Sequence, residues 1–126
     1  MATRALVGIE NADGTRTSIY VHYDGYPTGV GLALYRHYTS EAEVRSLMLS
    51  GDHSTLDRPE PWEGAYGDGS DAIITTGWPD VGQEWVYLWR DGQWFGASYD
   101  WTPTNRSPEV RLIPLRTLLE QHHAEV

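Results

Sequence analysis

The chain has 126 residues, no cysteine and a formal net charge of −9 at pH 7. This length predicts a single domain over residues 1–126 that buries its own core, and the lack of cysteine excludes disulfides, thiolate chemistry and cysteine-ligated zinc. The acidic balance argues against duplex nucleic acid as a partner, because binding a duplex requires a basic surface. The absence of a long apolar run and of a signal-peptide core predicts a cytoplasmic protein without a membrane span.

The first half of the chain predicts a β-hairpin and two short helices. Residues 4–10 and 15–23 favour strands, joined by an Asn-Ala-Asp-Gly turn. After an Asp-Gly-Tyr-Pro turn, apolar residues repeat at i, i+4 and i+8, which predicts a helix over about 28–38. The capping box of Ser40 and Glu43 predicts the start of a second helix, and Gly51 predicts its end.

The second half predicts a long loop, more strands and a final helix. Residues 52–71 contain several Pro and Gly clusters and no periodicity, which indicates a loop. Strands are expected at 72–76, 84–90, 93–98 and 110–113, with an Asp-Gly turn between the second and third. Pro114 predicts the start of a C-terminal helix. These elements predict an α+β fold, a twisted antiparallel sheet with two or three short helices packed on one face.

The strand that ends at the Asp-Gly-Tyr-Pro turn contains the first candidate site. Alternation along the strand places Tyr20, His22 and Asp24 on one face, with Tyr26 in the turn that follows. Thr28 is expected to cap a helix whose first amides stay open to an anion. In the alternative interpretation, Tyr20 and His22 face solvent or a partner strand, and Asp24 is an ordinary turn residue.

The six tryptophans, which all fall between residues 62 and 101, form a second candidate site. In the 84–98 hairpin a row with Trp85 and Trp89 alternates with a row containing Val86 and Leu88, and only one row can line the main core. If the aliphatic row is buried, the aromatic row is exposed and can stack on bases, sugars or partner side chains. One alternative is that the large rings form the core, and another is a mixed outcome in which some rings are buried and some are exposed. The sequence leaves the choice open.

The sequence contains no familiar catalytic or metal-binding motif. The five histidines lack metal-ligand spacing, and no nucleophile elbow, phosphate-binding loop or dinucleotide fingerprint occurs. We therefore expect no metal and no cofactor.

Three stretches resemble a largely uncharacterised family of small phage and prophage proteins: residues 18–31 (SIYVHYDGYPTGVG), 34–56 and 85–95 (WVYLWRDGQWF). The family shares an Ile-Tyr-x-His-x-Asp-Gly-Tyr-Pro segment, a His-Tyr plus short helix ending in Gly-Asp, and a Tyr-Leu-x-x-x-Gly-x-Trp hairpin. The resemblance covers roughly residues 4–120, although Val21 and Tyr23 replace the Cys and Trp of the family. It implies a phage accessory protein, a class that often counters host defence by inhibiting a defence protein or sequestering a nucleotide signal.

These observations lead us to expect an anti-defence protein, a homo-oligomer of the host cytoplasm, that sequesters a nucleotide-derived small molecule without turning it over. One alternative is an acidic inhibitor that mimics nucleic acid and docks on a host defence protein. Another is a nucleotide-processing enzyme that uses His22 and Asp24. The expected ligand-binding residues are Tyr20, His22, Asp24, Tyr26, Thr28, Arg36, Trp85, Trp89, Arg90, Trp94 and Arg111.

Overall fold

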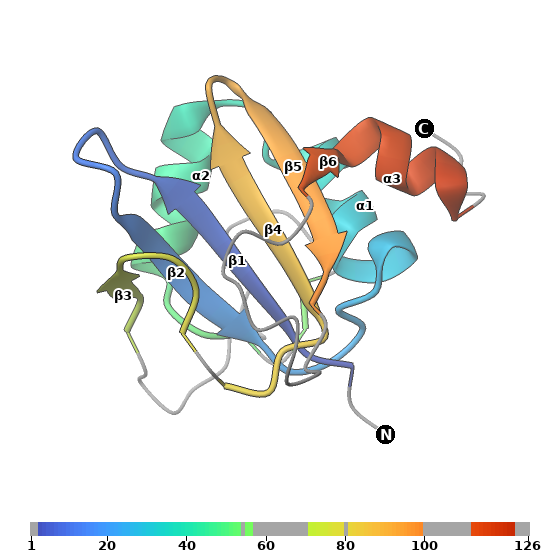
Figure 1. The fold of residues 1–126 in the computed structure, drawn as a ribbon, viewed down its shortest axis with the longest axis horizontal. Helices are drawn as coiled ribbons and strands as arrows, with labels where there is room; N and C mark the ends of the chain where they lie inside the picture. Colours follow the sequence, from blue (N-terminus) through green and yellow to red (C-terminus); the bar gives the residue numbers. More distant parts are fainter. Residues whose placement is uncertain (1–2, 54, 57–70, 80, 100–111, 123–126) are drawn as a thin grey trace.

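The computed structural model describes residues 3–53, 55–56, 71–79, 81–99 and 112–122. Within these residues six strands form one open sheet in the order β3-β2-β1-β4-β5-β6 (Figure 1). The strands are β1 (Ala5–Glu10), β2 (Arg16–Val21), β3 (Ile73–Thr75), β4 (Trp85–Arg90), β5 (Gln93–Ser98) and β6 (Ile113–Pro114). The α+β class is confirmed. The sheet is mixed rather than purely antiparallel, because β1 and β4 at its centre run parallel while the other neighbours run antiparallel.

The helical segments pack on one face of this sheet, as expected (Figure 1). They are η1, a π-helical turn (Pro27–Gly31), then α1 (Leu32–His37), α2 (Glu41–Leu49) and α3 (Leu115–Gln121). The expected helix over 28–38 corresponds to η1 and α1 in succession. The capping box of α2 is confirmed in part, since the Glu43 backbone N–H donates to Ser40 Oγ at 3.3 Å, while the Glu43 carboxylate accepts from the Thr39 N–H at 3.1 Å.

Both faces of the central strands β1 and β4 are buried. The helix-covered face contains the odd-numbered residues of β1 and β4, including Val7 and Tyr87, together with apolar residues from all the helices. The opposite face contains Leu6, Val86 and Leu88, which pack with Trp78 from the segment after β3. A strand that is buried on both faces has a continuous apolar sequence. For this reason the sequence of β4 did not reveal which of its two rows of side chains faces the helices.

Tyr87 occupies the centre of the helix-covered face. Its hydroxyl, fully buried, donates to the Gly25 carbonyl at 2.7 Å and so joins β4 to the turn that precedes η1. Glycines make room for the ring, because a Cβ on Gly96 would lie 2.9 Å from Tyr87 Cδ1 and one on Gly31 would lie 3.2 Å from Cε1. Gly25 itself sits where a Cβ would approach the Thr3 carbonyl oxygen to 2.7 Å. The glycines around the Asp-Gly-Tyr-Pro turn therefore serve close packing.

Replacing Tyr87 by Phe is expected to destabilise the protein by about 1–2 kcal/mol at pH 7, because the buried Gly25 carbonyl loses its donor. Burial raises the pKa of Tyr87 well above its usual value. Above about pH 10 the unfolded chain loses the phenol proton while the folded protein keeps it, so this group makes stability fall as pH rises. The Y87F variant should therefore lose stability less steeply than the wild type above pH 10. Urea unfolding from pH 7 to 11 measures both effects.

The matched control is Tyr23→Phe, since Tyr23 is half exposed. Equal losses in Y87F and Y23F at pH 7, or parallel alkaline slopes for Y87F and the wild type, would contradict this account.

Candidate functional site

The first candidate site lies at the end of the sheet where β2 finishes. Tyr20 lies on the face opposite the helices, and its hydroxyl is 2.7 Å from His22 Nδ1, a hydrogen-bonding distance. The backbone here is also engaged: the Tyr20 N–H donates to the Asp52 carboxylate at 2.8 Å, and the His53 N–H donates to the Tyr20 carbonyl at 2.9 Å. The segment after α2 thus covers the outer edge of β2, and Tyr20 and His22 belong to that edge.

In the turn after β2, backbone N–H groups donate to carbonyls of the same turn. The Gly29 N–H donates to the Tyr26 carbonyl at 2.9 Å and the Val30 N–H to the Asp24 carbonyl at 2.8 Å. Thr28 lies inside η1 and does not cap it, because the N-cap position is Tyr26. The expectation of a Thr28 cap with open amides for an anion is therefore wrong: the chain folds back so tightly that its own carbonyls occupy the Gly29 and Val30 donors.

The carboxylate of Asp24 has a partner within the same turn. Tyr26 donates its hydroxyl to Asp24 Oδ1 at 3.1 Å, and this hydrogen bond, with the charge of the carboxylate, raises the pKa of the exposed Tyr26 phenol. Asp24 has a φ of 58°, in the left-handed region, which suits a tight turn. Asp24 and Tyr26 therefore form a polar pair at the surface of the turn.

The tryptophans of the hairpin face the helices. Trp89 and Trp94 are 6% and 5% exposed, and their rings form an edge-to-face pair with centroids 5.5 Å apart. The interpretation in which the large rings join the core is therefore confirmed for these two residues, and an exposed row is wrong. Trp85 is half buried at the other end of β4, where its ring lies 5.4 Å from that of His122.

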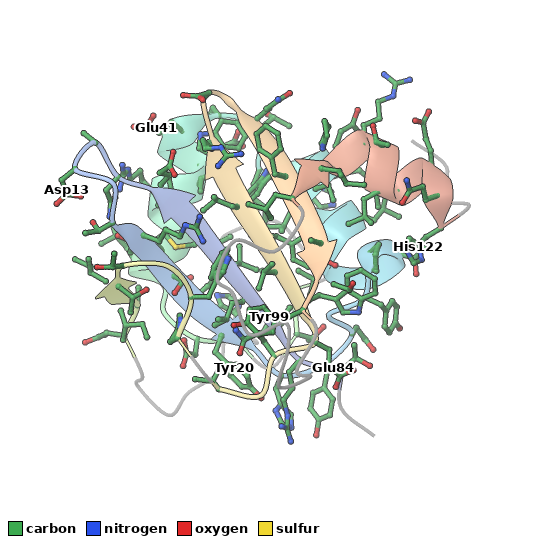
Figure 2. The ribbon with its side chains drawn as sticks, in the orientation of Figure 1. Asp13, Tyr20, Glu41, Glu84, Tyr99 and His122 are labelled. Atoms are coloured by element: carbon green, nitrogen blue, oxygen red, sulfur yellow. The ribbon has the colours of Figure 1, made fainter. Side chains whose placement is uncertain are left out.

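The strand register separates the two candidate sites. Tyr20 pairs with Leu6, whereas Trp89 pairs with Ile9, three residues further along β1 and about 10 Å away. The side chains also point to opposite faces of the sheet. Figure 2 shows Tyr20 at one end of the sheet and Glu41 of α2 near the other end. The sequence grouped these residues in one pocket, and the register excludes that arrangement.

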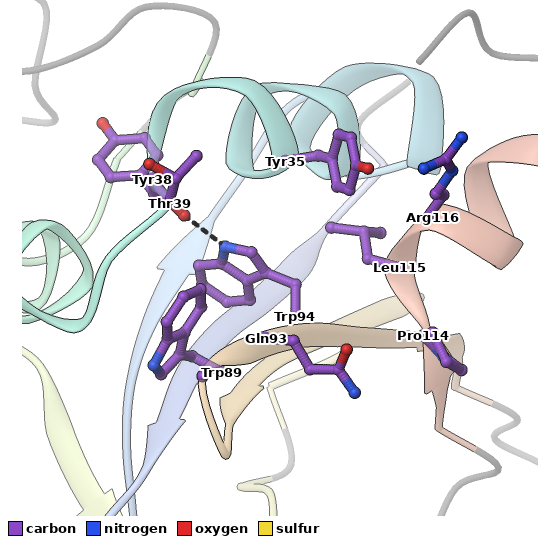
Figure 3. Close-up of a pocket in the computed structure, with 10 residues that line it drawn as sticks. Tyr35, Tyr38, Thr39, Trp89, Gln93, Trp94, Pro114, Leu115 and Arg116 are labelled. Carbon is purple, nitrogen blue, oxygen red and sulfur yellow. Dashed lines mark hydrogen bonds between the residues drawn. The ribbon is translucent and has the colours of Figure 1, made fainter.

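A groove opens at the tip of the β4–β5 hairpin, on the helix-covered face (Figure 3). We call it the hairpin-tip groove. Its volume is about 450 Å³. The end of α1, the hairpin and the start of α3 supply its walls, which are Tyr35, Tyr38, Thr39, Trp89, Gly92, Gln93, Trp94, Pro114, Leu115 and Arg116.

One buried hydrogen bond shapes this groove. The indole N–H of Trp94 donates to the carbonyl of Tyr38 at 2.8 Å and so holds the end of α1 against β5 (Figure 3). The N–H is thereby satisfied, which a buried indole requires. The ring of Trp94 offers a ligand only aromatic surface.

The charged residues differ between the groove and the hollow beside it. Among the described residues that line the groove, Arg116 is the only charged one. A second hollow of about 410 Å³ adjoins it, sharing Trp89 and Gly92, and its walls are more polar. The charged residues of this second hollow are Glu10, Glu41, Asp91, Arg45 and Arg90. The Arg90 guanidinium stacks over Phe95 at 4.7 Å from the ring centroid.

The structure therefore places the expected ligand-binding residues in different parts of the molecule. Trp89 and Trp94 line the hairpin-tip groove, and Arg90 lines the adjoining hollow. Arg36 is exposed on α1 and lines neither hollow, and Arg111 lies outside the described residues. Tyr35 and Arg116, which sequence reasoning missed, line the groove because α1 and α3 dock beside the hairpin. Their only sequence signal was their place on amphipathic helices, and that signal does not reveal which helices meet.

In comparisons with known proteins, no family model, no curated protein and no solved structure matches the chain. Across the described ranges no cluster of three or more His, Asp or Glu side chains could hold a metal ion. Nor does any helix within them have the length and apolar character needed to cross a membrane.

Replacing Trp94 by Phe is expected to destabilise the protein by about 2 kcal/mol, because the Tyr38 carbonyl loses its donor and the smaller ring leaves a void. Amide hydrogen exchange at residues 34–38 should accelerate, since this bond holds the end of α1. Urea unfolding and exchange mass spectrometry measure the two effects. Trp85→Phe is the control, and unchanged exchange at 34–38 in W94F would refute the assigned role.

Proposed function

We propose that the protein binds a nucleotide-like small molecule in the hairpin-tip groove and releases it unchanged. The observation that supports this most directly is the pairing of an aromatic wall, formed by Trp89 and Trp94, with Arg116, the one cation among the described lining residues. An aromatic base packs against aromatic side chains, and a phosphate binds a guanidinium group.

The size of the groove is consistent with this ligand class. Small-molecule sites measure roughly 300–1,000 Å³, and the groove measures about 450 Å³. Since Trp89 and Trp94 expose only 6% and 5% of their surface, a base would contact only a small part of each ring. Tyr35, which is half buried at the rim, adds a more accessible ring.

The geometry gives the enzymatic alternative little support. His22 lies against Tyr20, while the Asp24 carboxylate accepts a hydrogen bond from Tyr26. Neither His22 nor Asp24 lines the groove or the adjoining hollow. We therefore keep the proposal that the ligand is sequestered without turnover. We propose further that the protein is a phage accessory protein that acts against host defence in the host cytoplasm, as a homo-oligomer.

The charge of the surface favours a second candidate function, binding to a basic partner protein. Among the residues that the structure describes, exposed carboxylates outnumber exposed guanidinium groups by two to one. The acidic ones are Asp13, Asp24, Glu41, Glu43, Asp71, Glu84, Asp91 and Glu120, and the basic ones are Arg4, Arg36, Arg45 and Arg116. Such a complex would weaken steeply as salt is added, whereas a ligand held in the groove should be much less sensitive.

Protein purified from infected, defence-active cells should release an intact nucleotide-like molecule on heat denaturation, detected by mass spectrometry. Tyr35→Ala should reduce the amount recovered at least tenfold, because it removes the accessible ring at the rim. Tyr26→Ala is the matched control, since Tyr26 is an exposed tyrosine outside the groove. Recovery of a converted product would indicate an enzyme. Equal recovery from Y35A and the wild type would show that the groove is not the binding site.

A further inference from the structure

We propose that the hairpin-tip groove selects an aromatic ligand with one negative charge, such as a nucleotide with a single phosphodiester, and disfavours polyphosphates. This inference rests on the proposed function and adds the charge of the ligand to it. It follows from the cations and carboxylates that the described residues place at and beside the groove.

Arg116 is the one cation among the described residues of the groove wall, and it is able to bind a ligand anion. Its guanidinium lies 3.9 Å from the Glu120 carboxylate, and both side chains are more than half exposed. Exposed pairs of this kind contribute little to stability, so an anion entering the groove can replace Glu120 as partner. The planar guanidinium donates two parallel hydrogen bonds to one phosphate or carboxylate group. Arg116 therefore has the capacity to bind one anionic group.

Two carboxylates, those of Glu43 and Asp91, lie beside residues that line the groove. Thr39, which lines the groove, donates both its N–H and its hydroxyl to Glu43 at 3.1 Å. Hydrogen bonds from Ser40 and then from Thr39 lower the pKa of Glu43, so this carboxylate is charged at neutral pH. Asp91 flanks Gly92 at the hairpin tip. A second or third phosphate would approach these carboxylates, and like charges repel.

The adjoining hollow does not reverse this balance. Its described lining residues include Arg45 and Arg90 but also three carboxylates, so their formal charges sum to a negative value. Arg45 is already engaged, donating to Asn11 Oδ1 at 2.9 Å and lying 3.7 Å from the Glu41 carboxylate. A polyphosphate chain extending past Trp89 would therefore meet no surplus of positive charge from the described residues of this hollow.

The shape of the groove orients the ligand. Figure 3 shows Trp89 and Trp94 on one side and Arg116 across from them, with Tyr35 of α1 between the two sides. Because the Trp94 N–H is used by Tyr38, the tryptophan side contributes aromatic contact without a hydrogen-bond donor at that atom. The base of the ligand is thus directed toward the tryptophans and its anionic group toward Arg116.

Isothermal titration calorimetry tests the inference with four probes in each of the adenine, guanine and uracil series: the nucleoside, the 3′,5′-cyclic monophosphate, the 5′-monophosphate and the 5′-triphosphate. In the series that binds, the cyclic monophosphate should bind about tenfold tighter than the nucleoside, reflecting one charge-assisted contact, and tighter than the triphosphate. Arg116→Gln should remove the advantage over the nucleoside.

Two variants serve as controls. Arg45→Gln removes the same charge from the adjoining hollow and should keep the preference for the cyclic monophosphate. Glu120→Gln breaks the ion pair of Arg116 but keeps the guanidinium, and should keep or strengthen that preference. Thermal unfolding midpoints close to that of the wild type confirm that each variant is folded.

The outcomes separate this inference from the proposed function. A triphosphate or nucleoside that binds as tightly as the cyclic monophosphate, or a preference that survives in R116Q, overturns the charge selection and leaves the proposed function intact. If none of the probes binds in any of the three series, both the charge selection and nucleotide binding in the groove are overturned.

Discussion

Two buried hydrogen bonds hold the helical segment η1–α1 against the sheet, and the shape of the groove depends on them. The Tyr87 hydroxyl donates to the Gly25 carbonyl before the segment begins, and the Trp94 indole donates to the Tyr38 carbonyl where it ends. Both donors come from the β4–β5 hairpin and both acceptors are backbone carbonyls that would be costly to bury unpaired. The hairpin thus positions the helix from both ends, and the groove is the space left at the second end.

The parallel pairing of β1 and β4 decides what surrounds that groove. Parallel strands end at the same edge of the sheet, so Glu10 at the end of β1 comes beside Arg90 at the end of β4. The β2 strand runs the opposite way, which sends Tyr20 and His22 to the far end of the sheet. The aromatic groove and the polar turn of the first motif are therefore separate features of the molecule.

The face of the sheet opposite the helices is also covered, which explains why both rows of β4 are buried. Trp78 packs with Leu6, Val86 and Leu88, and the Arg16 guanidinium lies 4.9 Å from the centroid of its ring. With this face closed, the aliphatic row of β4 is buried as completely as the aromatic row. Hydrophobic burial on both sides gives the central strands a large share of the folding free energy.

The sequence by itself determined the local elements: the two hairpins, the start of α2 at Ser40 and the start of α3 beside Pro114, because these depend on contacts between residues a few positions apart. It also identified Trp89 and Trp94 as part of a candidate site. Tertiary structure alone decided which face of β4 meets the helices, because both rows are apolar. It also decided that Arg116 and Tyr35 border the groove, because they come together only when α3 docks beside α1. The first motif, 18–31, marks the close packing of a turn around Tyr87, a role that no local pattern reveals since its partner lies 62 residues away.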